Sequence, residues 1–161
     1  MPTPPGPSIA PTTSPGDDGA RLIEALAQGG VALKDVAGLT PADMDAIAKV
    51  GASAIQSGRF ELAVRVFSSL AALDPGEPLH LLHCAFAHKG AGQRDLAIEQ
   101  LGRFLDADVP KALPDVARAL LLRAELHGAG NRAAAAADLL AARALAARSP
   151  EVKQIVDGGA P

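Results

Sequence analysis

Aromatic residues are almost missing from this sequence. It contains no Trp and no Tyr, and only four of its 161 residues are Phe, although 48% of the residues are hydrophobic. The interior must therefore be built mainly from Ala, Leu, Val and Ile. Alanine and leucine favour helices, and the sequence lacks the runs of β-branched residues that form strands. We predict an all-α protein with one compact core, because domains commonly have ~100–150 residues.

Basic clusters and cysteine pairs are missing as well. The net charge is −3 and the Lys and Arg residues are dispersed among acids, which argues against nucleic-acid binding. A lone cysteine, Cys84, forms no disulfide within the chain and fits a reducing compartment. No apolar run approaches the ~20 residues of a membrane span, and the N-terminus does not resemble a secretory signal. We expect a cytoplasmic protein that does not bind membranes directly.

The first residues differ in composition from the rest of the chain. Residues 1–18 are rich in Pro, Gly, Ser and Thr, so ordering them would lose entropy without burying apolar surface. We predict a disordered tail; its PxxP-like character would also suit a proline-binding partner, but a flexible linker is the favoured interpretation. The folded domain is predicted at 19–157, followed by a frayed end at 158–161.

Helical patterns begin directly after this tail. Leu22, Ile23 and Leu26 recur at helical spacing until a Gly-Gly pair ends the run. The short segment VALKDVAGL then leads to Thr40 and Pro41, a residue suited to capping a helix and one suited to its first position. A long helix is predicted to start near Pro41.

An internal repeat is the strongest signal. Ala63 and Ala97 are 34 residues apart, as are Gly58 and Gly92, and this is the period of the tetratricopeptide repeat. Small residues let paired helices approach, while larger apolar residues fill the space between helical hairpins. We predict three tandem tetratricopeptide-repeat hairpins in a right-handed superhelix, with N-terminal helices and a short capping helix at SPEVKQIVD. The repeats are expected at about 44–77, 78–111 and 116–149.

The third repeat is less regular than the first two. With Gly130 as its inter-helix glycine, Ala135 lies 38 residues after Ala97, which implies four inserted residues near 109–114. That register places Arg123 at the position of a small residue. Placing Ala124 there instead would shorten the following turn, and both registers remain open.

The alanine-rich stretch NRAAAAADLLAARALAARS has two interpretations. It could be a helix that binds a partner, since alanine permits close approach. It could also be the second helix of the third repeat, which is favoured because helix propensity and repeat position agree.

Catalytic motifs are absent from the sequence. It has no glycine-rich phosphate loop followed by Lys, no nucleophile elbow and no carboxylate pair in a pocket-like context, so we expect neither enzymatic activity nor a cofactor. His80, His83, Cys84 and His88 share one predicted helix and are of metal-binding types. At ~100° per residue they fan out widely, and the last two fall at packing positions, so core residues are favoured over a metal site.

The first helix of each hairpin in such arrays lines a concave groove. An apolar groove of this kind suits a peptide, and each buried Leu-sized anchor could contribute ~1.5–3 kcal/mol. Some of these residues could instead pack on the N-terminal helices or on a second subunit. Repeat counting places the following residues on the groove: Asp45, Ala48, Ala52, Ile55, Leu79, Leu82, Phe86, Lys89, Ala117, Leu120 and Ala124.

Several motifs together resemble a known family. The run from ALAQGGVALKDVAGLTPADMDAI through SGRFELAVRVFSSLAALDP, with AGQRDLAIEQL and SPEVKQI further on, is similar to the class II chaperones of type III secretion, which serve hydrophobic translocator proteins. The likeness covers about residues 21–156. It implies three repeats, a groove for an extended translocator segment with a Pro-x-Leu-x-x-Pro-like pattern, and homodimerisation through the N-terminal helices, here Leu22, Ile23 and Leu26.

The sequence also departs from that family. Tyrosines are usual along the first inner helix, where this chain has Ala52 and Ile55, and Arg94 replaces a tyrosine of the second repeat. Deep aromatic pockets are therefore not expected. The predicted function is a cytoplasmic chaperone that keeps translocators from associating prematurely and competent for secretion. The alternative is a repeat adaptor or regulatory scaffold that assembles a complex.

Overall fold

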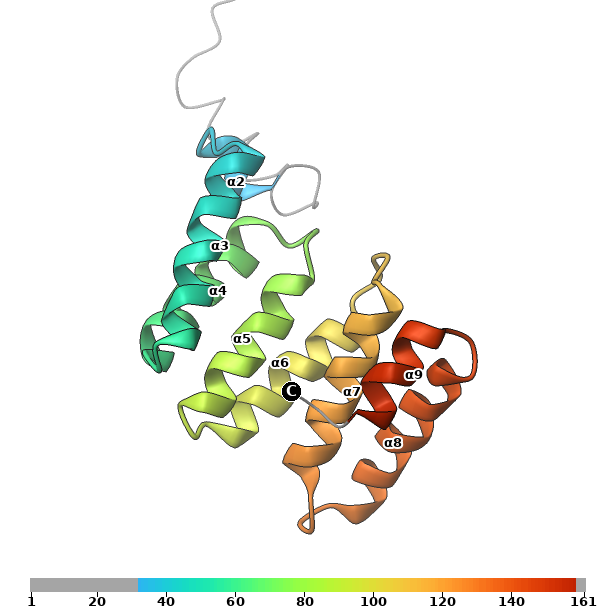
Figure 1. Cartoon of the computed structure of the whole chain (residues 1–161). Coiled ribbons are helices and arrows are strands. Elements are labelled where there is room, and N and C mark those ends of the chain that lie inside the picture. Colours follow the sequence, from blue (N-terminus) through green and yellow to red (C-terminus); the bar gives the residue numbers. More distant parts are fainter. Residues whose placement is uncertain (1–31, 159–161) are drawn as a thin grey trace, which may run out of the picture.

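The structure is a computed structural model that describes residues 32–158. This part of the chain contains helices and no strand, and the helices stack side by side in chain order (Figure 1). None of the described helices is long and apolar enough to span a membrane. The helices are α2 (Leu33–Val36), α3 (Pro41–Gln56), α4 (Phe60–Leu73), α5 (Leu79–Gly90), α6 (Arg94–Asp106), α7 (Leu113–His127), α8 (Arg132–Ala146) and α9 (Pro150–Asp157).

The start of α3 is where the sequence predicts it. The Thr40 side chain accepts a hydrogen bond from the Asp43 backbone N–H at 3.2 Å, and the Asp43 carboxylate accepts one from the Thr40 backbone N–H at 2.9 Å. This reciprocal pair satisfies two donors that a helix start leaves unpaired. The hydrogen bonds from Thr40 also lower the pKa of the Asp43 carboxyl.

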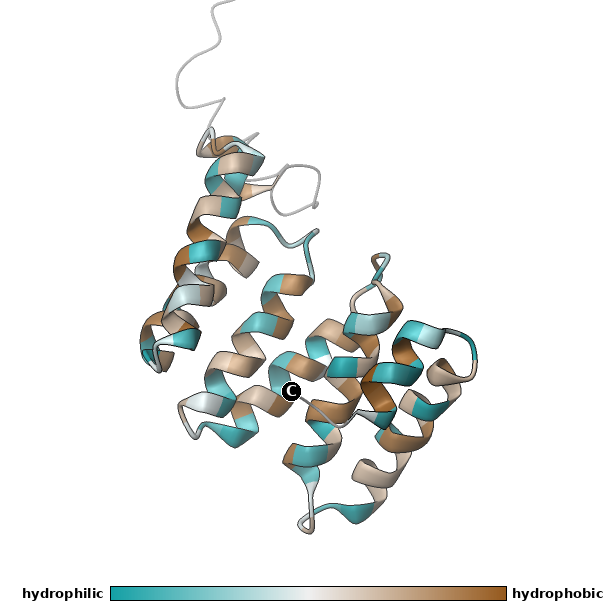
Figure 2. Cartoon of the chain, viewed as in Figure 1, coloured by the Kyte–Doolittle hydropathy of each residue, from teal (hydrophilic) through white to brown (hydrophobic). Residues whose placement is uncertain are grey.

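Three antiparallel hairpins form the array: α3 with α4, α5 with α6, and α7 with α8. Most of the helices carry hydrophobic residues on one side and hydrophilic residues on the other (Figure 2), whereas α5 buries residues around most of its circumference. The apolar sides meet in two buried clusters, one around Phe67 and Leu70 and one around Leu101 and Phe104. The predicted all-α tetratricopeptide-repeat fold is therefore confirmed.

Small residues allow the close approach of α3 and α4. A Cβ atom placed on Gly51 would lie 2.7 Å from the Phe67 ring, which is closer than any normal contact. Ala63 and Ala97, the residues that define the repeat period, are both fully buried. Gly58 and Gly92 have positive φ angles of 71° and 73°, so both hairpins turn through a left-handed glycine.

The third hairpin turns differently from the sequence prediction. Its left-handed glycine is Gly128, with φ of 44°, and not Gly130. Residues 128–131 connect α7 to α8, one residue more than 57–59 and 91–93 connect in the first two hairpins. Ala135 is half-buried, unlike its counterparts Ala63 and Ala97. The packing register of the third hairpin therefore differs from that of the first two.

An ion pair joins the two helices of the third hairpin. Arg123 Nε lies 2.9 Å from Asp138 Oδ2, and Arg123 Nη2 lies 2.6 Å from Asp138 Oδ1. Ala124 is 5% exposed, whereas the Arg123 side chain is 24% exposed. This packing favours Ala124 as the small residue of the third repeat. The alanine-rich stretch forms α8, the second helix of this hairpin.

The short helix α9 covers the end of the array. Ser149 caps it by accepting a hydrogen bond from the Val152 backbone N–H at 3.4 Å, and Pro150 occupies its first position. The Val152 side chain is fully buried against the last hairpin, since α9 packs on both α7 and α8. SPEVKQIVD thus forms the predicted helix.

Candidate functional site

The predicted groove residues divide into two groups by burial. Most of those on α3 and α5 are exposed or half-buried, whereas one on α5 and the three on α7 are buried. Exposed or half-buried are Asp45, Ala48, Ala52, Ile55, Leu79, Phe86 and Lys89. Buried are Leu82, Ala117, Leu120 and Ala124.

The buried group has a packing explanation. Leu82 is 2% exposed and belongs to the core cluster of Leu101 and Phe104, so it joins α5 to α6. Ala117, Leu120 and Ala124 are at most 7% exposed, because α7 turns these positions toward its neighbours. In this conformation the four side chains are core residues and offer no open surface to a ligand.

The exposed face of α7 lies one position further along the helix. Arg118, Leu121 and Glu125 have i, i+3 and i+7 spacing, share a face and retain surface, whereas Leu122 beside them is 2% exposed and belongs to the core. Taking Ala124 as the small residue of the third repeat would have placed Arg118, Leu121 and Glu125 at the groove positions. The second of the two registers that the sequence left open therefore predicts this face of α7.

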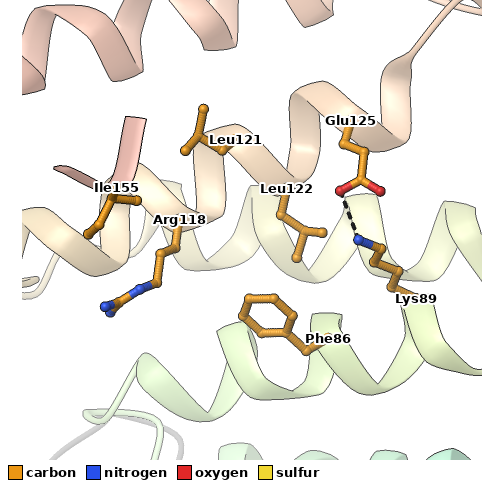
Figure 3. A pocket seen from close by; sticks show the side chains of 7 residues that line it. All are labelled: Phe86, Lys89, Arg118, Leu121, Leu122, Glu125 and Ile155. Carbon is orange, nitrogen blue, oxygen red and sulfur yellow. Dashed lines mark hydrogen bonds and ion pairs between the residues drawn. The ribbon is translucent and has the colours of Figure 1, made fainter. Parts of the chain in front are cut away.

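This face of α7 forms a hollow with α5 and α9. The hollow holds about 280 Å³ of space, part of it open to solvent, and Figure 3 shows the side chains that line it. We call it the α5–α7–α9 hollow. Its lining residues are Phe86 and Lys89 of α5, Arg118, Leu121, Leu122 and Glu125 of α7, and Ile155 of α9.

Ion pairs hold the charged residues at the rim of the hollow. Lys89 Nζ lies 2.8 Å from Glu125 Oε2 and so joins α5 to α7 across it (Figure 3). Arg118 Nη1 lies 2.8 Å from Asp115 Oδ1, one turn earlier on α7. Both pairs are partly exposed, so each contributes only ~0.2–1 kcal/mol to stability. Their main effect is to hold charges beside an apolar floor.

A second hollow lies where α5 and α7 begin. It holds about 420 Å³, including open solvent, and Leu79 and Phe104 form part of its wall. Charged residues are prominent here: Glu77, Lys111 and Asp115 also line it. The segment with the predicted insertion contributes Lys111, whose Nζ lies 5.9 Å from the centre of the Phe104 ring.

Cys84, His83 and His88 of α5 contact other side chains of the chain. Cys84 Sγ lies 3.3 Å from Ser68 Oγ, His88 Nδ1 lies 2.6 Å from Gln93 Oε1, and the His83 ring centre lies 4.9 Å from that of Phe67. Burial raises the pKa of the Cys84 thiol. In residues 32–158, no three His, Cys, Asp or Glu side chains come together as a metal site would require.

Arg94 has a structural contact that the sequence did not reveal. Its guanidinium donates hydrogen bonds to the backbone carbonyls of Leu126 and His127, the latter at 3.0 Å from Nη2. These are terminal carbonyls of α7, where a cation also interacts favourably with the helix dipole. The residue that replaces a family tyrosine therefore ties the start of α6 to the end of α7.

Two further predictions lie outside the described residues. The dimerisation residues Leu22, Ile23 and Leu26 precede residue 32, and so does the tail at 1–18. Both predictions stay untested.

Comparisons with known proteins agree with the fold and with the motifs. No family model matches the chain, and no curated protein matches its sequence. The structure of the Yersinia enterocolitica type III secretion translocator chaperone SycD matches with a TM-score of 0.70 and 25% identity, over 80% of this chain and 92% of that one. A T3SS complex from Aeromonas hydrophila matches with a TM-score of 0.75 and 24% identity, over 85% and 89%.

The fold is that of a tetratricopeptide-repeat-like helical array, which the two structures share over most of their length. The resemblance to the class II type III secretion chaperones of translocator proteins is confirmed by the likeness to SycD. This likeness supports a chaperone role.

Proposed function

We propose that the protein is a cytoplasmic chaperone for hydrophobic translocator proteins of type III secretion. The observation that carries this proposal is the likeness to a translocator chaperone over 80% of the chain. The inner helices supply a suitable surface, because Ala48, Ala52 and Ile55 of α3 and Phe86 of α5 are open or half-open and mostly apolar.

The physical basis is protection of apolar segments. A translocator segment held extended on α3, α5 and α7 would have its side chains covered and would be kept from associating with other copies. Such binding needs neither catalysis nor a cofactor. We further propose that the chain forms a homodimer through Leu22, Ile23 and Leu26.

Co-expression with a translocator tests this proposal. The partner should carry two long apolar helices, and we expect a soluble complex by size-exclusion chromatography with light scattering. Ala52→Glu and Leu79→Glu should each reduce complex formation at least about tenfold, because they place a charge on the inner face. Helical content by circular dichroism should be unchanged. A full yield of complex with both variants would rule out this groove.

One observation favours the adaptor alternative. Leu139 and Leu140 of α8 are 40% and 66% exposed, which leaves an apolar patch away from the inner helices. An adaptor that used this patch would lose its partner on Leu140→Glu and keep it on Ala52→Glu. The chaperone proposal requires the opposite result, so Leu140→Glu is the matched control in the same assay.

A further inference from the structure

The open side of α8 differs in composition from those of the other second helices of the hairpins. α8 packs on α7 and α9 through the side that buries Asp138 and Ala142, and its other side is exposed (Figure 1). On this exposed side α8 carries alanines, leucines and arginines. The exposed residues of α4 are mostly polar, and those of α6 are charged, with both signs, apart from Leu96. Only the third hairpin therefore turns an apolar helix face outward.

Leu140 lies at the centre of this exposed face. It is 66% exposed, and at ~100° per residue only alanines and Arg143 lie within about 60° of it around the helix. Five exposed residues follow one another at alternating steps of four and three, as the a and d positions of a coiled coil do. We call them the α8 seam: Ala133, Ala137, Leu140, Ala144 and Ala147. Small residues along a seam let a second helix approach closely.

The charges beside the α8 seam are all positive. Arg132 and Arg143 border it on one side, and Arg148 follows in the turn after α8. Among residues 32–158, no ion pair engages these three arginines. The one acid of residues 132–148, Asp138, is buried and bonded to Arg123. The exposed face thus combines an apolar centre with cations that have no acid beside them on α8.

The apolar surface extends beyond α8. Arg143 and Ala147 also line a depression between α8 and α9, together with Lys153 and Val156 of α9. The depression holds about 830 Å³, including open solvent. A partner that lies along the α8 seam would therefore also meet apolar and cationic groups of α9.

Three kinds of occupant differ in how well they fit this face. A second copy of the chain would bring Arg132 against Arg148 if two seams paired antiparallel about Leu140, and like charges oppose such contacts. Helices that lie in a lipid surface carry large residues such as Trp, Phe and Leu on their apolar side, whereas four of the five seam residues are alanine. A helix from another protein, with small apolar residues and acidic flanks, matches both the shape and the charge.

We propose that the exposed face of α8 binds a second protein through one acidic amphipathic helix. The apolar stripe of that helix lies along the α8 seam, and its acidic residues pair with Arg132, Arg143 and Arg148. The proposed groove uses α3, α5 and α7, so this contact leaves the groove free. The inference goes beyond the chaperone function and does not require a bound translocator.

The probe for this contact is a fluorescent three-heptad peptide with Leu and Ala at its a and d positions and Glu at e and g. The glutamates repel one another and keep the peptide from pairing with itself. Its Kd for the full chain is measured by fluorescence anisotropy. The same peptide with Lys in place of Glu should bind at least about tenfold more weakly, and added salt should weaken the Glu peptide. No binding of the Glu peptide, or equal binding of both peptides, would overturn the proposal.

Substitutions on the exposed face locate the contact. Leu140→Glu should raise the Kd at least about tenfold, because it places a charge under the apolar stripe of the peptide. Arg132→Gln combined with Arg143→Gln should raise it at least about threefold, since exposed ion pairs contribute modestly. Wild-type affinity in either variant would contradict the proposed contact.

Leu96→Glu is the matched control. Leu96 is 43% exposed on α6 and lies among charged residues, so the control adds the same charge to an outer helix of another hairpin. It should change the Kd less than about twofold, as surface substitutions away from a site do. Circular dichroism checks that Leu140→Glu and Leu96→Glu keep their helices. Equal losses in the two variants would mean that added negative charge, and not the α8 seam, is responsible.

The other occupants give different results. If Leu140→Glu lowers the molar mass of the free chain in light scattering, the face joins two copies and the proposal is wrong. Co-sedimentation with vesicles of phosphatidylcholine and phosphatidylglycerol that Leu140→Glu abolishes would equally overturn it in favour of a lipid surface. Ala52→Glu should lose the translocator and keep the peptide, and Leu140→Glu should do the reverse. Failure of the chaperone function and failure of this contact are therefore separate outcomes.

Discussion

The first and third hairpins join their helices by opposite chemistry. In the first, Gly51 of α3 leaves room for the Phe67 ring of α4, which is 1% exposed. In the third, Arg123 of α7 and Asp138 of α8 make two hydrogen bonds across the same kind of interface. One repeat architecture therefore tolerates both close apolar packing and a paired charge, provided that the contacting residues of the two helices are complementary in size or charge.

The largest effect is expected in the first hairpin. Phe67→Ala should lower the free energy of unfolding by about 3–5 kcal/mol, because it leaves a cavity in the core. Urea denaturation with an unchanged m-value would measure it. Gly51→Ala alone should destabilise through overlap with the ring, and in the Phe67→Ala background most of that cost should disappear, which leaves the contact with Val66 Cγ1 at 3.0 Å. Simple additivity of the two costs would contradict the contact.

A smaller loss is expected from the third hairpin. Asp138→Ala should cost about 3 kcal/mol, the lower end of the range for breaking a buried pair, because Arg123 retains some exposure. The double variant Arg123→Leu and Asp138→Leu should recover most of that loss in the same urea assay. If the double variant is as unstable as Asp138→Ala, the ion pair is needed for the register of the hairpin and not merely compatible with it.

The smallest effect is a loss of stability at acid pH, and it involves the boundary between the first two hairpins. Burial lowers the pKa of His80 and of His83. Lys34 for His80, and His80 for His83, lower the pKa further, whereas the nearby acids Glu77, Asp74 and Asp115 oppose the shift. The unfolded chain therefore binds more protons below the ordinary histidine pKa of ~6.5, so this stability is present above that pH and lost as pH falls through the lowered pKa.

Urea denaturation at pH 7.5 and 5.5 measures this loss. Wild type should be less stable at pH 5.5, and a variant with His80→Gln and His83→Gln should lose most of that difference. Asp138→Ala should keep it, because the two histidines lie on α5 and the ion pair joins α7 to α8. The same pH difference in the histidine variant would mean that other groups are responsible.

Part of the site could be predicted from the sequence and part could not. On α5, the 34-residue spacing selects Phe86 and Lys89, which line the α5–α7–α9 hollow, but also Leu82, which is a core residue. The inner positions of α7 do not follow, because the count placed Arg123 at the small position that Ala124 occupies in the structure. A change of one residue turns a helix by ~100°, which exchanges a surface residue for a core one.

The features that depend on local chemistry follow from the sequence. Alanine and leucine favour helices, and Thr40 and Pro41 stabilise the start of α3. The 34-residue spacing of Ala63 and Ala97 indicates the first two hairpins. Which side chains share a surface depends on the packing of the helices. Leu82 is core because α6 covers it, and Ile155 reaches a groove formed by α5 and α7 because α9 folds back over the last hairpin. Such contacts join residues far apart in the chain, and no local pattern records them.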